Sequence, residues 1–163
     1  MRGTRTLSLA AVALALVGCG GGGGSNVGAF TGIWQYVSGQ LAVTSCSVAG
    51  DGSTTALSGE TMTLGKAASS DLTYNASYEP KCVYNLDIKG PNATLATSPP
   101  CMDSGVAADG TPYTVLVTPT SWLLTVTDTS MTENASVNLV YTFSGGGSES
   151  CVGSITGAAL TKR

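Results

Sequence analysis

Apolar and polar residues alternate with a period of two along most of the chain after Phe30. The clearest runs lie at residues 72–78, 82–89, 122–126 and 137–143. Successive side chains of a strand point to opposite faces, so such runs predict strands with one buried face. Beyond the apolar N-terminal run, the sequence has no convincing helical period of about 3.6 residues. The alternation therefore predicts an all-β domain.

Short turn motifs separate these runs. They are Asp51-Gly52, Lys89-Gly90-Pro91-Asn92, Ser98-Pro99-Pro100, Asp109-Gly110, Pro119-Thr120 and Gly145 to Gly147. Further strands are expected at residues 33–37, 40–47, 60–66, 93–97, 113–118 and 154–161. About 8–10 short strands without crossover helices predict an antiparallel meander that closes into a small barrel. An immunoglobulin-like β-sandwich is the alternative architecture.

The N-terminus has the layout of an export signal. Arg2 and Arg5 precede an apolar run at residues 7–17, which is shorter than the roughly 20 residues of a membrane-spanning helix. The run ends in Leu16-Val17-Gly18-Cys19, which resembles the lipobox of bacterial lipoproteins. That resemblance implies cleavage before Cys19 and attachment of diacylglycerol to its thiol, usually with acylation (palmitate) of the new amino terminus. The lipid bilayer would then be a permanent partner, because two or more acyl chains give a lasting anchor.

The resemblance to lipoproteins also implies a place and a domain layout. The residue after Cys19 is Gly20 rather than Asp, which in two-membrane bacteria usually implies the outer membrane of the cell envelope. Residues 1–18 would be the signal peptide and residues 19–29 the lipidated cysteine with a glycine-rich, flexible tether. Residues 30–163 would form one β domain, which is long enough to bury a core.

The remaining cysteines predict disulfides. Cys46, Cys82, Cys101 and Cys151 are an even number in a chain expected in an oxidising compartment. Four cysteines allow three pairings. Cys82 and Cys101 flank two consecutive predicted strands, so a hairpin would bring them together, and Cys46 would then pair with Cys151. Since the first and last regions of a closed barrel are neighbours, the second bridge fits a barrel.

Gly32-Ile33-Trp34 lies at the first predicted strand, and Lys162-Arg163 follows the last one. This arrangement resembles the lipocalin and calycin barrels. The resemblance implies that Trp34 closes the base of the barrel, with Arg163 or Lys162 over its ring in a cation–π contact. The chain departs from that family because Gly145 to Gly147 replace the usual helix before the final strand. The simpler interpretation of Trp34 is an ordinary core aromatic.

Residues that could carry catalysis are sparse. The chain has no histidine, which removes the Ser-His and Cys-His couples, and it has no Gly-x-Ser-x-Gly motif. Most carboxylates lie in expected turns, and a pair such as Glu60 with Glu79 has no supporting pattern. Cysteine spacing and the lack of histidine argue against a metal site. We therefore expect no enzyme, no cofactor and no metal.

Two functions from different classes fit this chain. Acidic residues outnumber basic ones by 10 to 7, so no basic surface for nucleic acid is expected. The general expectation is a membrane-anchored envelope lipoprotein with a structural or interaction role toward another envelope protein. The alternative is a barrel that binds a small apolar ligand and that would need an interior cavity of several hundred Å³. The candidate lining residues are Tyr74, Tyr84, Trp122, Tyr141 and Phe143, together with Leu86 and Leu124.

Overall fold

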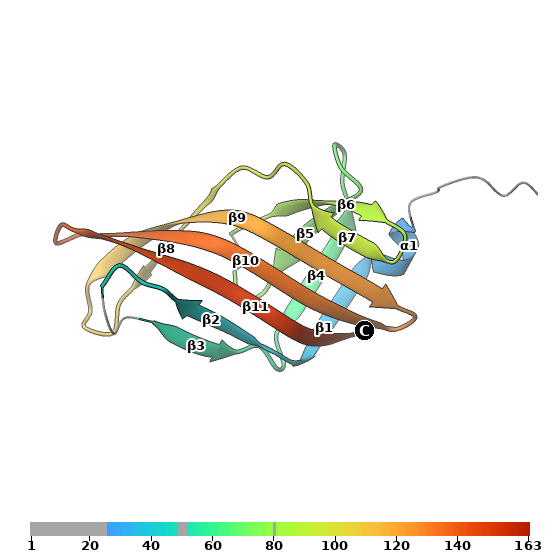
Figure 1. The fold of residues 1–163 in the computed structure, drawn as a ribbon, viewed down its shortest axis with the longest axis horizontal. Helices are drawn as coiled ribbons and strands as arrows, with labels where there is room; N and C mark the ends of the chain where they lie inside the picture. The colour runs from blue at the N-terminus through green and yellow to red at the C-terminus, as the bar shows by residue number, and fades with distance from the viewer. Residues whose placement is uncertain (1–25, 49–51, 80) are drawn as a thin grey trace, which may run out of the picture.

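The computed structural model describes residues 26–48, 52–79 and 81–163. Within these residues the chain is almost entirely β, with eleven strands in one antiparallel sheet (Figure 1). The predicted all-β, antiparallel class is confirmed. The predicted signal peptide, Cys19 and the tether up to residue 25 lie outside the described residues.

One short helix precedes the strands. It is α1 (Val27–Phe30), and it occupies residues 27–29 that were expected to belong to the tether. The strands are β1 (Gly32–Ser38), β2 (Gln40–Thr44), β3 (Ser53–Ala56), β4 (Thr61–Lys66), β5 (Leu72–Ala76), β6 (Tyr84–Lys89), β7 (Asn92–Leu95), β8 (Cys101–Val106), β9 (Pro112–Thr127), β10 (Ser130–Phe143) and β11 (Ser148–Lys162).

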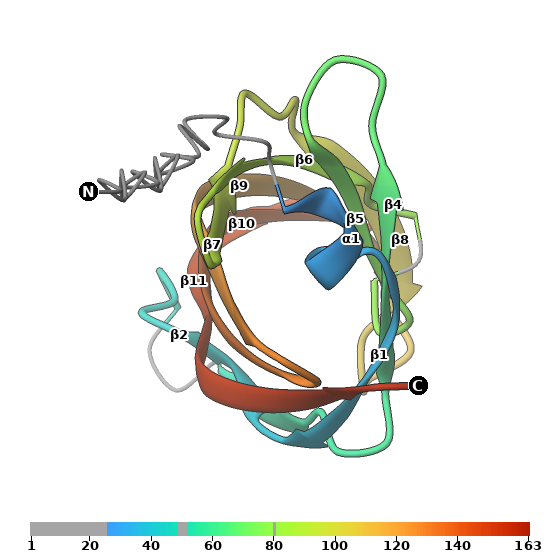
Figure 2. The same ribbon diagram turned by 90° about the vertical axis from the view of Figure 1, so that its right-hand side faces the viewer.

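Eight strands form a closed ring in the order β1-β4-β5-β6-β7-β9-β10-β11, with β11 pairing back to β1 (Figure 2). Trp34 of β1 lies opposite Lys162 of β11 at this closure. Closure leaves the strands of the ring without free edges. The closed ring agrees with the predicted barrel rather than with the alternative sandwich.

The long strands β9, β10 and β11 continue beyond the part of the molecule where the ring closes (Figure 1). β9 pairs first with β8, up to Val117, and then with β7 from Leu123. β11 pairs first with β2, up to Ile155, and then with β1 from Ala159. The half with β1 and β4 to β7 is called the closed end. The other half, with the strand order β8-β9-β10-β11-β2-β3, is called the open end.

A sharp bend between β1 and β2 lets one segment serve both ends. Gly39 joins the two strands with φ +130°, and a Cβ atom there would lie 2.5 Å from the Cβ of Ala158. Neither this backbone conformation nor this close approach suits a larger residue. The bend therefore carries the chain from the closed end to the open end along the same neighbour, β11.

The core of the closed end is filled by aromatic and aliphatic side chains at alternating strand positions. Large buried residues there include Trp34, Tyr36, Tyr74, Tyr84, Phe30, Met62, Leu64, Leu72, Leu86 and Leu124. Helix α1 lies within the outline of the ring in Figure 2. The indole Nε1 of Trp34 donates a hydrogen bond to the carbonyl oxygen of Phe30 at 2.6 Å. The closed end is thus a packed hydrophobic core with its own covering helix.

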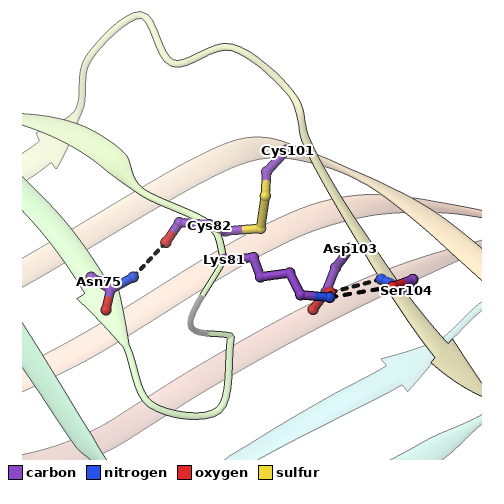
Figure 3. Close-up of a disulfide and its surroundings, with 6 residues drawn as sticks. All are labelled: Asn75, Lys81, Cys82, Cys101, Asp103 and Ser104. Carbon is purple, nitrogen blue, oxygen red and sulfur yellow. Dashed lines mark hydrogen bonds and ion pairs between the residues drawn. A yellow bond between two sulfur atoms is a disulfide. The ribbon is translucent and has the colours of Figure 1, made fainter.

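Two disulfides join Cys46 to Cys151 and Cys82 to Cys101, which is the predicted pairing. Figure 3 shows the second bridge, between the segment that enters β6 and the start of β8. The first bridge ties the segment after β2 to the middle of the open-end part of β11. Each bridge therefore fixes a segment next to one free side of the open end.

The strand predictions were wrong in three places. Pro119-Thr120 is not a turn, because β9 continues through it with a register shift opposite Ser136 and Val137. Proline lacks an N–H group, and a bulge accommodates it within the strand. Strands β3 and β8 were not predicted, since their short and largely polar sequences lack a clear apolar alternation.

Candidate binding cleft

A cavity of about 230 Å³ lies on the inner face of the open end. Its walls are mainly aliphatic and come from β2, β9, β10 and β11. The apolar lining residues are Leu41, Val43, Val115, Val117, Ala135, Val137, Leu139 and Ile155. Tyr78 and Glu79 reach it from the loop between β5 and β6, and Asp103 reaches it from β8. The cavity is therefore apolar along the long strands and acidic toward β8.

Strand register explains which side chains meet in the cleft. Asp103, Val115, Tyr141 and Glu149 lie opposite one another on β8, β9, β10 and β11, so they form one row across the inner face. In the adjacent row, Cys101 and Cys151 lie at the two sides of Val117 and Leu139. Each disulfide thus has one cysteine in this second row of side chains, which lies at the bottom of the cleft.

A second hollow of about 520 Å³ adjoins the first and shares Val43, Tyr113 and Tyr141 with it. It also contacts Phe143, Glu149, Asp109 and the Cys46–Cys151 bridge. Its aromatic wall is ordered by edge contacts, with ring centroids 5.3 Å apart for Tyr113 and Tyr141. The two hollows together are called the cleft.

Glu79 is an acidic group of the cleft whose ionisation is strongly perturbed. Its backbone is held by hydrogen bonds from the N–H of Cys82 to its carbonyl and from its own N–H to Ala76. Burial, which disfavours the charged form, raises the pKa of Glu79 to about 7, and the charge of Asp103 acts in the same direction. The buried hydroxyl of Tyr84 faces this carboxylate without a hydrogen bond of normal length.

Asp103 has the opposite environment. Lys81 Nζ lies 2.5 Å from its Oδ1, and the same nitrogen donates to Ser104 Oγ at 3.2 Å (Figure 3). The hydrogen bond from Lys81 lowers the pKa of Asp103, and a backbone bond from Ser104 adds to the effect. Asp103 therefore carries a compensated negative charge at neutral pH, in contrast to Glu79.

The closed end holds a buried polar cluster that sequence reasoning missed. Glu133 is fully buried, and its carboxylate accepts hydrogen bonds from Tyr36 Oη and, at 2.8 Å, from Trp122 Nε1. Tyr36, Tyr74 and Tyr78 continue the chain of hydroxyl contacts. Burial raises the pKa of Glu133. Trp122 joins this cluster to the cleft, because its side chain also lines the cavity.

The predicted ligand-lining residues divide between the two ends. Trp122 and Tyr141 line the cavity, and Tyr141 and Phe143 line the second hollow. Tyr74 and Tyr84 line neither hollow, because they are buried in the packed closed end, and their rings contact Trp122 with centroids 4.7 and 5.0 Å away. Their alternating pattern predicted the inner face correctly but could not tell a filled interior from a hollow one.

Lys162, and not Arg163, is the cation at the base. Its Nζ lies 5.4 Å from the ring centroid of Trp34 and donates to the carbonyl oxygens of Gly28 and Ala29, each at 3.2 Å. Arg163 instead donates from Nε to Gln35 Oε1 at 3.1 Å. Alternation explains the difference, because Lys162 lies opposite Trp34 and Arg163 is one residue further along.

One group of potential metal ligands has a simpler explanation. Cys46, Glu149 and Cys151 place their ligand atoms within 4.8 Å of one another. The two sulfur atoms are joined in a disulfide and so offer no thiolate to a metal. This cluster is therefore part of the wall of the cleft.

Comparison with protein families, with curated protein sequences and with solved structures finds no match to this chain. The resemblances to lipoproteins and to lipocalins stay predictions that rest on the motifs themselves. Among the residues that the structure describes, no helix has the length and apolar character needed to cross a membrane.

Proposed function

We propose that this chain is a membrane-anchored lipoprotein of the bacterial envelope whose β domain binds a small, largely apolar ligand in the cleft. The observation that carries the proposal is the cavity of about 230 Å³ with aliphatic walls at the open end. A packed domain with a purely structural role needs no such space, since protein interiors are close-packed.

The size of the cavity limits the ligand. Water occupies roughly 30 Å³ per molecule in the liquid, so the cavity has space for a body of about seven to ten non-hydrogen atoms. Known ligand sites are mostly larger, on the order of 300–1,000 Å³. A larger ligand would extend into the second hollow past Tyr113 and Tyr141, where aromatic rings line its path.

The anchor supports the location of this activity. The sequence Leu16-Val17-Gly18-Cys19 predicts attachment of lipid at Cys19, and the glycine-rich segment after it would hold the domain close to the bilayer. A ligand of the envelope or of the outside medium would meet the cleft there. A structural or interaction role toward an envelope protein is the second candidate, and the packed closed end favours it.

Native mass spectrometry of the full protein, extracted gently from membranes, tests the proposal. We expect acyl chains on Cys19, two disulfides and a bound small molecule that dissociates on denaturation. Val115→Phe fills the cavity, so its preparation should retain the lipid but lose the small molecule. An outer-face substitution on the same strand, Leu116→Phe, is the matched control. Lipidated protein without any bound molecule, and without affinity for small apolar probes, would contradict ligand binding and favour the structural role.

A further inference from the structure

We propose that the ligand of the cleft carries a cationic group, such as a primary amine, that binds beside the carboxylate of Glu79. This inference rests on the proposed ligand binding and adds the chemical class of the ligand. It predicts a molecule with a short apolar body against the long strands and a positively charged end toward the loop between β5 and β6.

The charges around the cleft have one sign. Glu79 and Asp103 line the cavity, and Asp109 and Glu149 line the second hollow. Among the described residues that line either hollow, none is lysine or arginine. The nearby Lys81 is engaged with Asp103 and has a half-exposed side chain. A ligand carboxylate would meet like charge from Glu79, whereas a cation would meet complementary charge.

Within the described part of the chain, neither a lysine nor an arginine contributes to the pKa shift of Glu79. The groups shown to interact electrostatically with it are the hydroxyls of Tyr84 on β6, Tyr141 on β10 and Tyr78 in its own loop, and the carboxylate of Asp103 on β8. Lys81 compensates Asp103 instead. Partial burial disfavours the charged form of a carboxylate unless an opposite charge or hydrogen bonds compensate it. A ligand ammonium group supplies that charge.

The Tyr84 hydroxyl gives a second, independent observation. The Tyr84 side chain is fully buried, and its hydroxyl faces the Glu79 carboxylate without a hydrogen bond of normal length. Buried polar groups are normally paired, and the Glu79 carboxylate is the acceptor available to this hydroxyl. When a bound cation holds Glu79 in its ionised form, the carboxylate becomes a strong acceptor for the Tyr84 O–H group.

Protonation of Glu79 makes the proposed binding dependent on pH. With the pKa of free Glu79 at about 7, the carboxyl is protonated below that pH, and binding of a cation must then release the proton. Affinity for an amine should rise as pH increases toward 7 and level off above it. Below the pKa the affinity should fall, by up to about tenfold per pH unit, until the contribution of the charge is lost.

Three probes with the same six-carbon chain separate charge from apolar burial: hexylamine, hexan-1-ol and hexanoate. Calorimetric titration of the full, detergent-extracted protein at pH 8 should show hexylamine binding about tenfold more tightly than hexan-1-ol. Hexanoate should bind most weakly. At pH 6 the preference for the amine over the alcohol should decrease, whereas the affinity for the alcohol should not change.

Glu79→Gln should abolish the preference for hexylamine and its pH dependence while leaving hexan-1-ol binding intact. Asp87→Asn, which removes an exposed carboxylate of β6, is the control and should behave as the wild type. If the alcohol and the amine bind equally to the wild type, or if the preference survives in Glu79→Gln, the cationic class is wrong although apolar binding stands. If none of the three probes binds, the proposed function itself fails.

Discussion

The same three long strands, β9, β10 and β11, build a filled core at one end of this molecule and a cleft at the other. At the closed end the sheet completes its ring, and fully buried aromatic residues such as Trp34 and Tyr84 occupy the interior. At the open end, β8 and β3 are free edges, and the inner face carries valines, a small alanine and the glycine Gly153. Closure with large side chains gives a solid core, and a six-stranded sheet with small side chains leaves space.

The two ends also differ in what holds them together. Hydrophobic burial and the Glu133 cluster stabilise the closed end. The open end has fewer buried aromatic residues and has a disulfide near each free side. We therefore expect substitutions at the closed end to affect mainly global stability, and changes at the open end to affect mainly the cleft.

Truncating a large aromatic residue should show the greatest contrast. Trp34→Ala removes a fully buried ring from the closed end and should lower the free energy of unfolding by about 4 kcal/mol. Val115→Ala enlarges an existing hollow and should lower it by about 1 kcal/mol. Denaturant unfolding followed by circular dichroism measures both. Equal losses would mean that the open end is packed as tightly as the closed end.

Removal of the Cys82–Cys101 bridge should have the next largest effect. The bridge spans 19 residues, and its loss by the double substitution Cys82→Ser, Cys101→Ser should destabilise by about 3 kcal/mol in the chain-entropy model. Hydrogen exchange should accelerate first in β8, which among the described strands pairs with β9 alone. If exchange instead accelerates more in β5 than in β8, the bridge supports the closed end.

Glu133, which is buried, and Glu79, which is partly buried, should respond in opposite directions. Glu133→Ala leaves Tyr36 and Trp122 without their shared acceptor and should destabilise by about 3 kcal/mol. Glu79→Gln should stabilise the protein at pH 8 by about 1 kcal/mol, because it removes a carboxylate that is ionised in an unfavourable environment.

The sign for Glu79 follows from its raised pKa in the folded state. Protonation of Glu79 favours the folded form. The contribution of this residue to stability is therefore fully present below about pH 4.5 and is lost as pH rises through about 7. Melting temperatures between pH 5 and 8 should therefore fall more steeply for the wild type than for Glu79→Gln. Parallel curves would contradict the buried environment of Glu79.

The smallest expected effect concerns the base of the ring. Lys162→Met removes the cation over Trp34 and the bonds to the carbonyl oxygens of α1, and should destabilise by about 1 kcal/mol. Arg163→Met removes only an exposed contact to Gln35 and should change stability by less than about 0.5 kcal/mol. Thermal melts of the two variants measure the difference, and a larger effect of Arg163 would reverse the assignment of the base cation.

The sequence contains enough information for most of the closed end. Alternation predicted its strands, and an even number of cysteines with a hairpin between Cys82 and Cys101 predicted both bridges. Glu133 could have been found by extending the alternation of β10 toward its N-terminal end. It lies between Met131 and Ala135 in the series of every second residue that points inward. An acidic residue at a core position is an uncommon signal, and the predicted run began only at residue 137.

The open end could not be predicted in the same way. Strand β3 has four exposed residues, so it has no buried face for a pattern to reveal. The approach of Glu79 to Asp103 depends on the path of the loop between β5 and β6, which is a tertiary property. Alternation also cannot distinguish a cavity from a filled core, because in both cases every second residue is apolar and points inward.

The most direct test of the account compares the two ends in one experiment. The chain has two tryptophans, Trp34 in the packed closed end and Trp122 in the wall of the cavity. Fluorine NMR of the full protein labelled with 5-fluorotryptophan, with the signals assigned through Trp34→Phe, reports on both during a titration with hexylamine. We expect the Trp122 resonance to shift in a saturable manner while the Trp34 resonance stays in place. A titration that leaves Trp122 unmoved, or that shifts Trp34 instead, would contradict a binding cleft at the open end.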